Sequence, residues 1–371
     1  MNQSKRIVSH TTFLLIFSFG IFAFYGQSDK RYIKTVSGKP VSISQLDNHI
    51  KKIMDSIAMP GLSIAIINNA EVVYHNTFGV INIKGKSPVT KKTIFEAASL
   101  SKPLFAYFVM KMVEKGKFDL DTPIYPHLKE IFPANTIDSV SFDYYRTITP
   151  RIVLSHATGI PNWAKGKPIH IAFKPGTGFS YSGEAYQHLG AAMGTSLGIG
   201  WHSKLDTLFL KEVAHPLKMN TSFYTWNDTI KKYKAKGHQK GKVNLEIEKY
   251  NAVGPGYSLH SEALDYARFL IEMMKPKHLK QELIDEMLKE HNHFKSDNKL
   301  LKEVGQTGWG LGFAQKPTAN GLMHLHTGNN HDFQSYAMFV PKQQYGIALF
   351  TNSDTLLPLI EKIGELIEQQ F

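Results

Sequence analysis

The order of apolar and polar positions predicts strands near both ends of the chain. Residues 62–80 alternate on either side of Asn68-Asn69, and two such runs joined by a polar dipeptide are typical of a β-hairpin. Residues 334–340 and 345–351 form a second pair of apolar runs around the turn at 341–344. Because strands need partners, we expect these two hairpins to join one sheet.

Helical patterns occupy much of the remaining chain. Residues 99–114 are apolar almost all round and precede Gly116, which indicates a buried helix with a glycine stop. Further helices are expected at 41–58, 261–274, 279–290 and 356–369. The predicted fold is therefore α+β, an α/β sandwich. Its antiparallel sheet is built from N- and C-terminal strands and flanked by helices, with a mainly helical subdomain inserted in mid-chain.

The N-terminus has the pattern of an export signal. Lys5 and Arg6 precede thirteen uncharged residues at 13–25, too few for a membrane span of about 20. We expect residues 1–28 to be a signal peptide, 29–43 a linker and 44–371 the functional domain. The bulky Phe24 and Tyr25 favour the alternative of an uncleaved anchor. Either way the domain is expected to be exported, and to be periplasmic or extracellular.

Composition narrows the chemistry. The 371 residues include no Cys, which excludes disulfides, thiolate zinc sites and a cysteine nucleophile. The formal charge is +12, and basic residues concentrate at Lys231, Lys232, Lys234, Lys236, Lys240 and Lys242. A solvated loop is the simplest interpretation of that run, with association to an anionic membrane or cell-wall surface as the alternative. No nucleic-acid partner is expected for an exported protein.

The first chemical signal lies at the start of the buried helix, in Ser99-Leu100-Ser101-Lys102. Residues three apart share a helix face, so the Lys102 amine can approach the Ser99 hydroxyl. A serine is a weak nucleophile unless a neighbouring base activates it. A lysine at the mouth of a buried helix is costly without such a role.

Several segments together resemble the serine β-lactamase and penicillin-binding protein superfamily, in particular its class C and low-molecular-mass peptidase and esterase branch. The resemblance covers about residue 44 to the C-terminus. It rests, in order along the chain, on Pro60-Gly61-Leu62, TIFEAASLSK at 93–102, IVLSHATGIP at 152–161, PGTGFSYSG at 175–183 and His326-Thr327-Gly328.

The resemblance implies a β-lactamase/transpeptidase-like fold and a secreted serine hydrolase acting through an acyl-enzyme on Ser99. Lys102 and Tyr181 would form the base pair, and a nearby lysine ammonium would favour the Tyr181 phenolate. The N–H groups of Ser99 and Asn329 would form the oxyanion hole beside His326, Thr327 and Gly328. No cofactor and no metal are expected. The substrate would be an ester or a D-amino-acid-containing peptide, a small molecule or a peptidoglycan-like polymer.

The chain departs from the superfamily in two places. Gly183 stands where the second catalytic element usually ends in Asn, and Asn329-Asn330-His331-Asp332 replaces a small or glycine-rich turn. In the superfamily, the side-chain amide of that Asn would bind the substrate's acyl-side carbonyl, and this chain lacks it. We therefore expect amides, β-lactams included, to be poorer substrates than esters.

Two alternatives remain open. His324 and His326 share one face of a predicted strand, and with His331 or Asp332 they would supply three ligands for a metallohydrolase. The other is a non-catalytic or acylation-only binding and sensing module that keeps the superfamily fold.

Overall fold

A computed structural model describes Met1 and residues 32–367, and the expected signal segment otherwise lies outside the described residues. The described residues 32–367 belong to one compact unit. Its centre is an eight-stranded sheet with the order β4-β3-β14-β13-β12-β11-β10-β9, in which every neighbouring pair is antiparallel. These strands are β3 (Gly61–Asn68), β4 (Glu71–Gly79), β9 (Asn292–His293), β10 (Gly308–Trp309), β11 (Ala314–Thr318), β12 (Gly321–Asn329), β13 (Gln334–Val340) and β14 (Tyr345–Thr351).

The sheet joins the two ends of the chain. β3 pairs with β14, and Ala65 lies opposite Ala348. The expectation of one sheet built from an N-terminal and a C-terminal hairpin is therefore confirmed. The N-terminal hairpin turns at Asn69 and Ala70, both with positive φ, as a tight turn between twisted strands requires.

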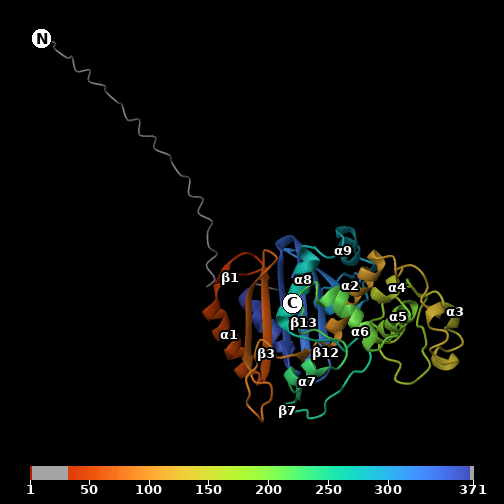
Figure 1. The fold of residues 1–371 in the computed structure, drawn as a ribbon, viewed down its shortest axis with the longest axis horizontal. Helices are drawn as coiled ribbons and strands as arrows, with labels where there is room; N and C mark the ends of the chain where they lie inside the picture. The colour runs from red at the N-terminus through yellow and green to blue at the C-terminus, as the bar shows by residue number, and fades with distance from the viewer. Residues whose placement is uncertain (2–31, 368–371) are drawn as a thin grey trace. The chain divides into compact units, whose positions relative to one another are not determined.

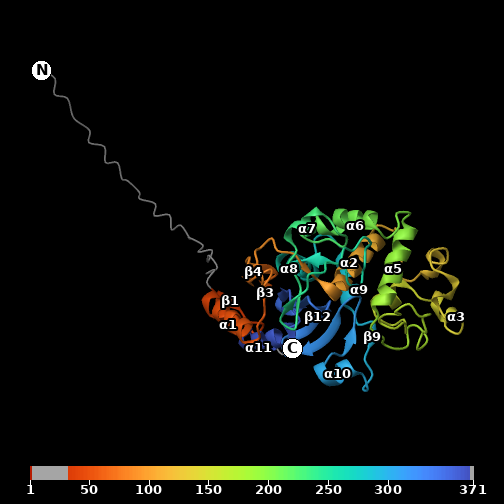
Figure 2. The ribbon, with the colours of Figure 1, turned by 90° about the horizontal axis from the view of Figure 1, so that it is seen from below.

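Helices cover both faces of the sheet, because its central strands are apolar on both sides. Leu62, Ile64 and Ile66 of β3 face one cluster, while Ala65 and Ile67 face the other. The first cluster includes α1 (Ile43–Ser56) and α11 (Leu356–Ile367), which lie side by side on that face in Figure 2. The second includes α2 (Ser101–Glu114) and α8 (Ala263–Met274).

Mid-chain helices, yellow to green in Figure 1, gather on the α2 side away from α1 and form the expected helical insertion. They are α3 (Phe142–Tyr145), α4 (Pro150–Leu154), α5 (Gly183–Ser196) and α6 (Ser203–Phe209), and α7 (Asp228–Tyr233) follows them in the chain. The other short elements are α9 (Gln281–Leu288), α10 (Lys299–Val304), and the two-stranded ladders β5 (Phe95–Glu96) with β8 (His260–Ser261) and β6 (His238–Gln239) with β7 (Lys242–Val243).

The segment expected to be a linker contributes structure from residue 32 onward. β1 (Tyr32–Lys34) pairs with β2 (Pro40–Ser42), and Ile33 and Val41 are buried in the cluster that contains α1. These two apolar residues anchor the strand pair to the body. Across the described part of the chain, no helix is both long enough and apolar enough to cross a bilayer.

Candidate active site

Ser99 sits in a short turn, residues 97–101, that we call the nucleophile turn. It is a 3₁₀ segment (Ala98–Leu100) leading directly into α2. Ala98 has φ +49, a left-handed conformation that is unusual outside glycine. Buried hydroxyls hold the turn in place: Tyr266 donates to Leu100 O at 2.9 Å and Tyr224 donates to Ser101 O at 2.7 Å.

Lys102 lies one helical turn beyond Ser99 and is fully buried. Its Nζ lies 3.0 Å from Ser99 Oγ and donates to Gly256 O at 2.8 Å. Burial lowers the pKa of Lys102 from 10.5 to about 7, because a charged amine is poorly solvated there. A large fraction of the amine is therefore neutral near pH 7 and has a lone pair with which to take the serine proton.

Tyr181 is brought beside this pair by the 152–161 segment. Ser180 N donates to His156 O at 2.8 Å and Ser182 N donates to His156 Nδ1 at 3.1 Å, so both neighbours of Tyr181 are tied to one residue. The Tyr181 and His156 rings pack 4.4 Å apart. This packing explains why the 152–161 segment accompanies the catalytic elements.

The expected Tyr181 phenolate is not favoured by this environment. Burial raises the pKa of Tyr181 above its usual value of 10, and the hydrogen bond with Ser99 only partly opposes that rise. Lys102 Nζ lies over the face of the tyrosine ring, 4.7 Å from its centroid. The pKa of Lys102 is lowered, so its amine is not fully protonated near neutral pH. It therefore does not supply the full positive charge that a phenolate would need.

β12 brings the third element against the nucleophile turn. A Cβ on Gly328 would lie 2.3 Å from Ala97 O and 2.1 Å from Ser335 Oγ, so the close approach excludes any side chain there. Thr327 and Asn329, on either side of Gly328, are exposed. Asn329 lines the same cavity as Ser99, as an oxyanion-hole partner must.

His326 is buried behind Tyr181, with ring centroids 5.9 Å apart. Burial and the nearby Lys102 amine lower the pKa of His326 to about 3. Its Nδ1 donates to Thr327 O at 2.7 Å. The ring is therefore neutral at physiological pH and offers no positive charge to a substrate carboxylate.

Gly183 begins α5, and its missing side chain is replaced in space by another residue. A Cβ on Gly183 would lie 2.5 Å from Cζ2 and Cη2 of Trp163. The indole thus occupies the room in which the side chain of an Asn would begin. Sequence reasoning missed Trp163 because it lies in a loop with no motif of its own.

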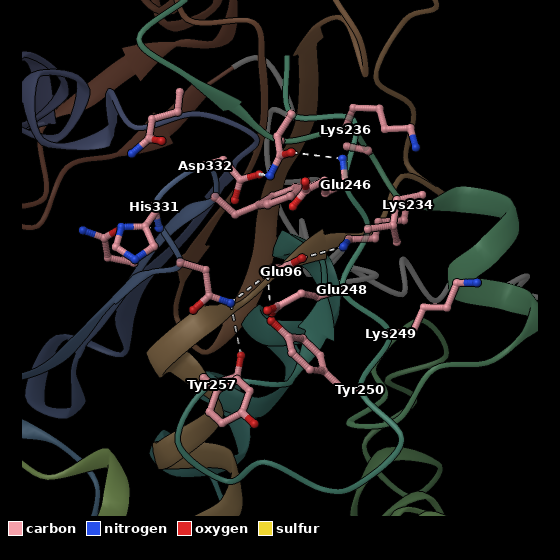
Figure 3. A pocket seen from close by; sticks show the side chains of 18 of the residues that line it. Glu96, Lys234, Lys236, Glu246, Glu248, Lys249, Tyr250, Tyr257, His331 and Asp332 are labelled. Carbon is pink, nitrogen blue, oxygen red and sulfur yellow. Dashed lines mark hydrogen bonds and ion pairs between the residues drawn. The ribbon is translucent and has the colours of Figure 1, made fainter. Parts of the chain in front are cut away.

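A cavity with a volume of about 1060 Å³ is lined in part by Ser99. Figure 3 shows Glu96 and Lys234 joined within it. They form an ion pair of 2.5 Å, each side chain 8% exposed. Asn330 Nδ2 donates to Glu96 Oε2 at 2.7 Å. The extra residues after Gly328 therefore bind back to the segment that carries the nucleophile.

The basic run at 231–242 therefore contains both solvent-exposed lysines and lysines that lie at the cavity. Lys231, Lys232, Lys240 and Lys242 are exposed, as expected of a solvated segment. Lys234 is not, because its amine pairs with Glu96, and Lys236 lines the cavity. The position of Glu96 three residues before Ser99 was the available signal for this pair.

The histidines of the metal alternative do not converge with a third ligand. The His324 ring stacks on Phe339 and His326 packs on Tyr181. Asp332 accepts a hydrogen bond from Asn244 at 3.0 Å. Within the described residues, no group of three or more His, Asp or Glu side chains is placed to hold a metal ion.

Comparison with known proteins identifies the family and the fold. A family model described as "Beta-lactamase" matches residues 46–369. A β-lactamase of Providencia stuartii is 25% identical over 89% of this chain and 94% of its own length. The octameric penicillin-binding protein homologue from Pyrococcus abyssi superposes with a TM-score of 0.73 at 22% identity, covering 89% of this chain and 78% of that one. D-alanine carboxypeptidase AmpC from Burkholderia cenocepacia superposes with a TM-score of 0.71 at 20% identity, covering 88% and 99%.

Proposed function

Since the chain belongs to the β-lactamase family, whose members are serine acyl-enzyme hydrolases, we propose that it hydrolyses acyl compounds through Ser99. The observation that carries the proposal is the 3.0 Å contact between Ser99 Oγ and the buried Lys102 amine. A base at hydrogen-bond distance is what converts a serine hydroxyl into a nucleophile.

The proposed reaction has two halves. Ser99 Oγ attacks the carbonyl carbon and its proton passes to Lys102 Nζ, while the N–H groups of Ser99 and Asn329 stabilise the oxyanion. The bond to the leaving alcohol then breaks, and the alcohol takes the proton with Tyr181 assisting. Water, deprotonated by the same amine, attacks the acyl carbon; the bond from that carbon to Ser99 Oγ breaks, Oγ takes the proton back from Lys102, and the carboxylic acid is released. Each oxyanion donor is worth about 2.7 to 4 kcal/mol.

We propose an ester as the preferred substrate, with a D-amino-acid-containing peptide as the second candidate. Two features of the site support the ester. Gly183 lacks a side-chain amide for an acyl-side carbonyl, and the neutral His326 does not attract a peptide carboxylate. The D-peptide remains the second candidate because the relative is named a β-lactamase and the structural neighbour a D-alanine carboxypeptidase.

The test begins with a fluorophosphonate probe, which labels an activated serine. We expect labelling at Ser99 and hydrolysis of p-nitrophenyl acetate, both lost in Ser99→Ala. Ser87→Ala, which changes an exposed serine outside the cavity, should retain both. Turnover at the parent rate by Ser99→Ala would reject the proposal, and labelling without turnover of esters or D-alanyl peptides would establish the acylation-only binding module instead.

Export is part of the proposal and rests on the composition of residues 1–28. When cells expressing the full chain are fractionated, we expect to find the protein outside the cytoplasmic fraction. Its intact mass will distinguish a cleaved signal from a retained anchor. Recovery of the full-length protein in the cytoplasm would contradict export without affecting the assignment of Ser99.

A further inference from the structure

Trp163 covers the backbone that supports the catalytic lysine. Its six-membered ring lies against Gly183, and a Cβ on Gly256 would come within 3.4 Å of Trp163 Cη2. Gly256 is the residue whose carbonyl accepts from Lys102. The indole therefore rests on two glycines beside the reacting pair, and a side chain at Gly183 would overlap it.

The loop that carries Trp163 is fixed to the start of α5 on both sides of the indole. Gly183 N donates to Asn162 Oδ1 at 2.9 Å and Glu184 N donates to Asn162 O at 2.8 Å. Ala164 N in turn donates to Glu184 Oε2 at 3.0 Å. These hydrogen bonds fix the loop backbone on both sides of Trp163, and packing against Gly183 and Tyr257 restricts the ring, so a ligand that packs on it loses little ordering entropy.

Two tyrosines extend the indole across the cavity. The Tyr257 ring packs edge-to-face on Trp163 at 5.7 Å, and Tyr250 packs edge-to-face on Tyr257 at 5.2 Å. Figure 3 shows Tyr257 and Tyr250 side by side below Glu96. We call Trp163, Tyr257 and Tyr250 the aromatic wall. All three line the cavity that contains Ser99.

The two ends of this wall differ in chemistry. Tyr250 lies near the charged end, where its hydroxyl donates to Glu96 Oε2 at 3.4 Å. Trp163 lies at the Gly183 end, where no side chain projects from residue 183, and its own side chain is 38% exposed. An exposed, rigid indole beside a nucleophile is an apolar surface suited to a flat apolar group.

Building on the proposed function, we propose that the aromatic wall selects esters whose acyl group carries a planar apolar ring, an arylacetyl group for example. The ring would pack on Trp163 and Tyr257 while its carbonyl lies at Ser99. An aromatic contact of this kind corresponds to roughly three- to tenfold in affinity. Small acyl groups such as acetyl do not reach the wall and gain nothing from it.

The experiment compares p-nitrophenyl phenylacetate with p-nitrophenyl acetate, which share one leaving group. The measured quantity is the ratio of their kcat/KM values. We expect a ratio well above that for uncatalysed hydrolysis in the parent protein, a fall of roughly three- to tenfold in Trp163→Ala, and most of the preference retained in Trp163→Phe. Tyr144→Ala, an exposed aromatic outside the cavity, should leave the ratio unchanged.

A second measurement does not depend on turnover. Phenylmethylboronic acid and methylboronic acid both bind an activated serine, and the ratio of their inhibition constants should change with the Trp163 variants in the same way. Folding of each variant is checked by circular dichroism, with Trp163→Phe as the variant closest in shape to the parent.

Failure of the proposed function and failure of this inference give different results. No acetate turnover together with no probe labelling of Ser99 would reject the proposed function. Acetate turnover with the same phenylacetate ratio in the parent and Trp163→Ala would overturn the aromatic wall alone. So would a Trp163 effect confined to aryl leaving groups, measured as phenyl acetate against ethyl acetate, because it would place the ring on the alcohol side.

Discussion

Among the residues that the structure describes, the amine of Lys102 has no carboxylate partner, and its environment decides which group can act as the proposed base. Its contacts are the Ser99 hydroxyl, the Gly256 carbonyl and the rings of Tyr181 and Tyr186. None of these stabilises an ammonium as strongly as water does. The neutral amine is therefore accessible near neutral pH, whereas the Tyr181 phenolate is not.

The first prediction concerns the pH dependence of acylation. Because Lys102 must be unprotonated and its pKa lies at about 7, kcat/KM for p-nitrophenyl acetate should be high above pH 7 and fall tenfold per unit below it. Tyr181→Phe should lower the rate more than tenfold but keep this limb near pH 7. A limb near pH 10 that Tyr181→Phe abolishes would instead make the tyrosine the base.

The second prediction concerns Gly183. Gly183→Asn alone should lower the free energy of unfolding by roughly 1 to 3 kcal/mol, because the new side chain overlaps the Trp163 indole. Gly183→Asn combined with Trp163→Ala should recover that loss. It should also raise kcat/KM for a chromogenic cephalosporin by up to about tenfold over Trp163→Ala, the value of one hydrogen bond. Equal cephalosporin rates in these two proteins would mean that position 183 does not contact the acyl amide.

Residue-scale chemistry was only partly readable from the sequence. Ser99, Lys102 and Tyr181 belong to motifs with fixed spacing, and the structure brings them together. Trp163 could not be found this way, since its role depends on a loop folding back onto α5. The upward shift of the Tyr181 pKa could not be predicted from the sequence either, because it depends on how deeply the side chain is buried.

Elements meet at the nucleophile turn, where β5, α2, β8 and β12 converge. β5 pairs with β8, and Ala97 N donates to Leu259 O at 2.8 Å. Ser335 Oγ on β13 donates to Ala97 O at 2.6 Å from the other side. The Glu96–Lys234 pair adds a link to the segment after α7. The turn thus depends on elements from widely separated parts of the chain.

The third prediction tests that link. Lys234→Met should lower the free energy of unfolding by about 3 to 5 kcal/mol in a urea titration, because it leaves the buried Glu96 carboxylate without its partner. Glu96→Gln with Lys234→Met should recover a large part of the loss. Lys232→Met, which alters an exposed neighbour on α7, is the matched control. A Lys234→Met protein as stable as this control would show that solvent already screens the pair.

Element boundaries followed the sequence where one periodicity dominated. The runs at 334–340 and 345–351 are β13 and β14 as expected, and 356–369 contains α11. The helix expected at 99–114 has its first residues wound as a 3₁₀ turn. The cause is tertiary, because the Tyr266 and Tyr224 hydroxyls hold the carbonyls of Leu100 and Ser101.

At the scale of the whole molecule, the active site lies on the α2 face of the sheet and the terminal helices cover the other. α11 contributes Leu356, Leu359, Ile360, Ile363 and Ile367 to the cluster that contains α1. His49 Nε2 on α1 lies 3.1 Å from Lys362 O. This layer stabilises the sheet, and of the proposed catalytic residues Tyr181 packs against the same apolar cluster.

The fourth prediction separates stability from catalysis. Ile363 is fully buried, so Ile363→Ala should lower the free energy of unfolding by about 2 to 5 kcal/mol. At a temperature where the variant is folded, its kcat/KM for p-nitrophenyl acetate should match that of the parent. Glu361→Ala, on the exposed side of the same helix, should change neither quantity. A selective loss of kcat/KM in folded Ile363→Ala would show that the two faces of the sheet are coupled.

The architecture was predictable because both hairpins carry strong local signals and share an apolar character. The two-stranded ladders β5–β8 and β6–β7 were not, since pairs of two residues leave no periodicity to detect. The order of the sheet strands that lie nearest the helical insertion likewise depends on packing between residues far apart in the sequence.

The pairing of β3 with β14 also governs when this protein can become active during its synthesis. Ser99 and Lys102 leave the ribosome early, but the strand that lies beside β3 and the one that carries Asn329 are made near the end. Contacts so distant along the chain form slowly and late. A nascent chain that has emerged only as far as Lys102 therefore carries its serine and lysine without the proposed oxyanion hole or a closed sheet, and the proposed hydrolysis requires translation through β14.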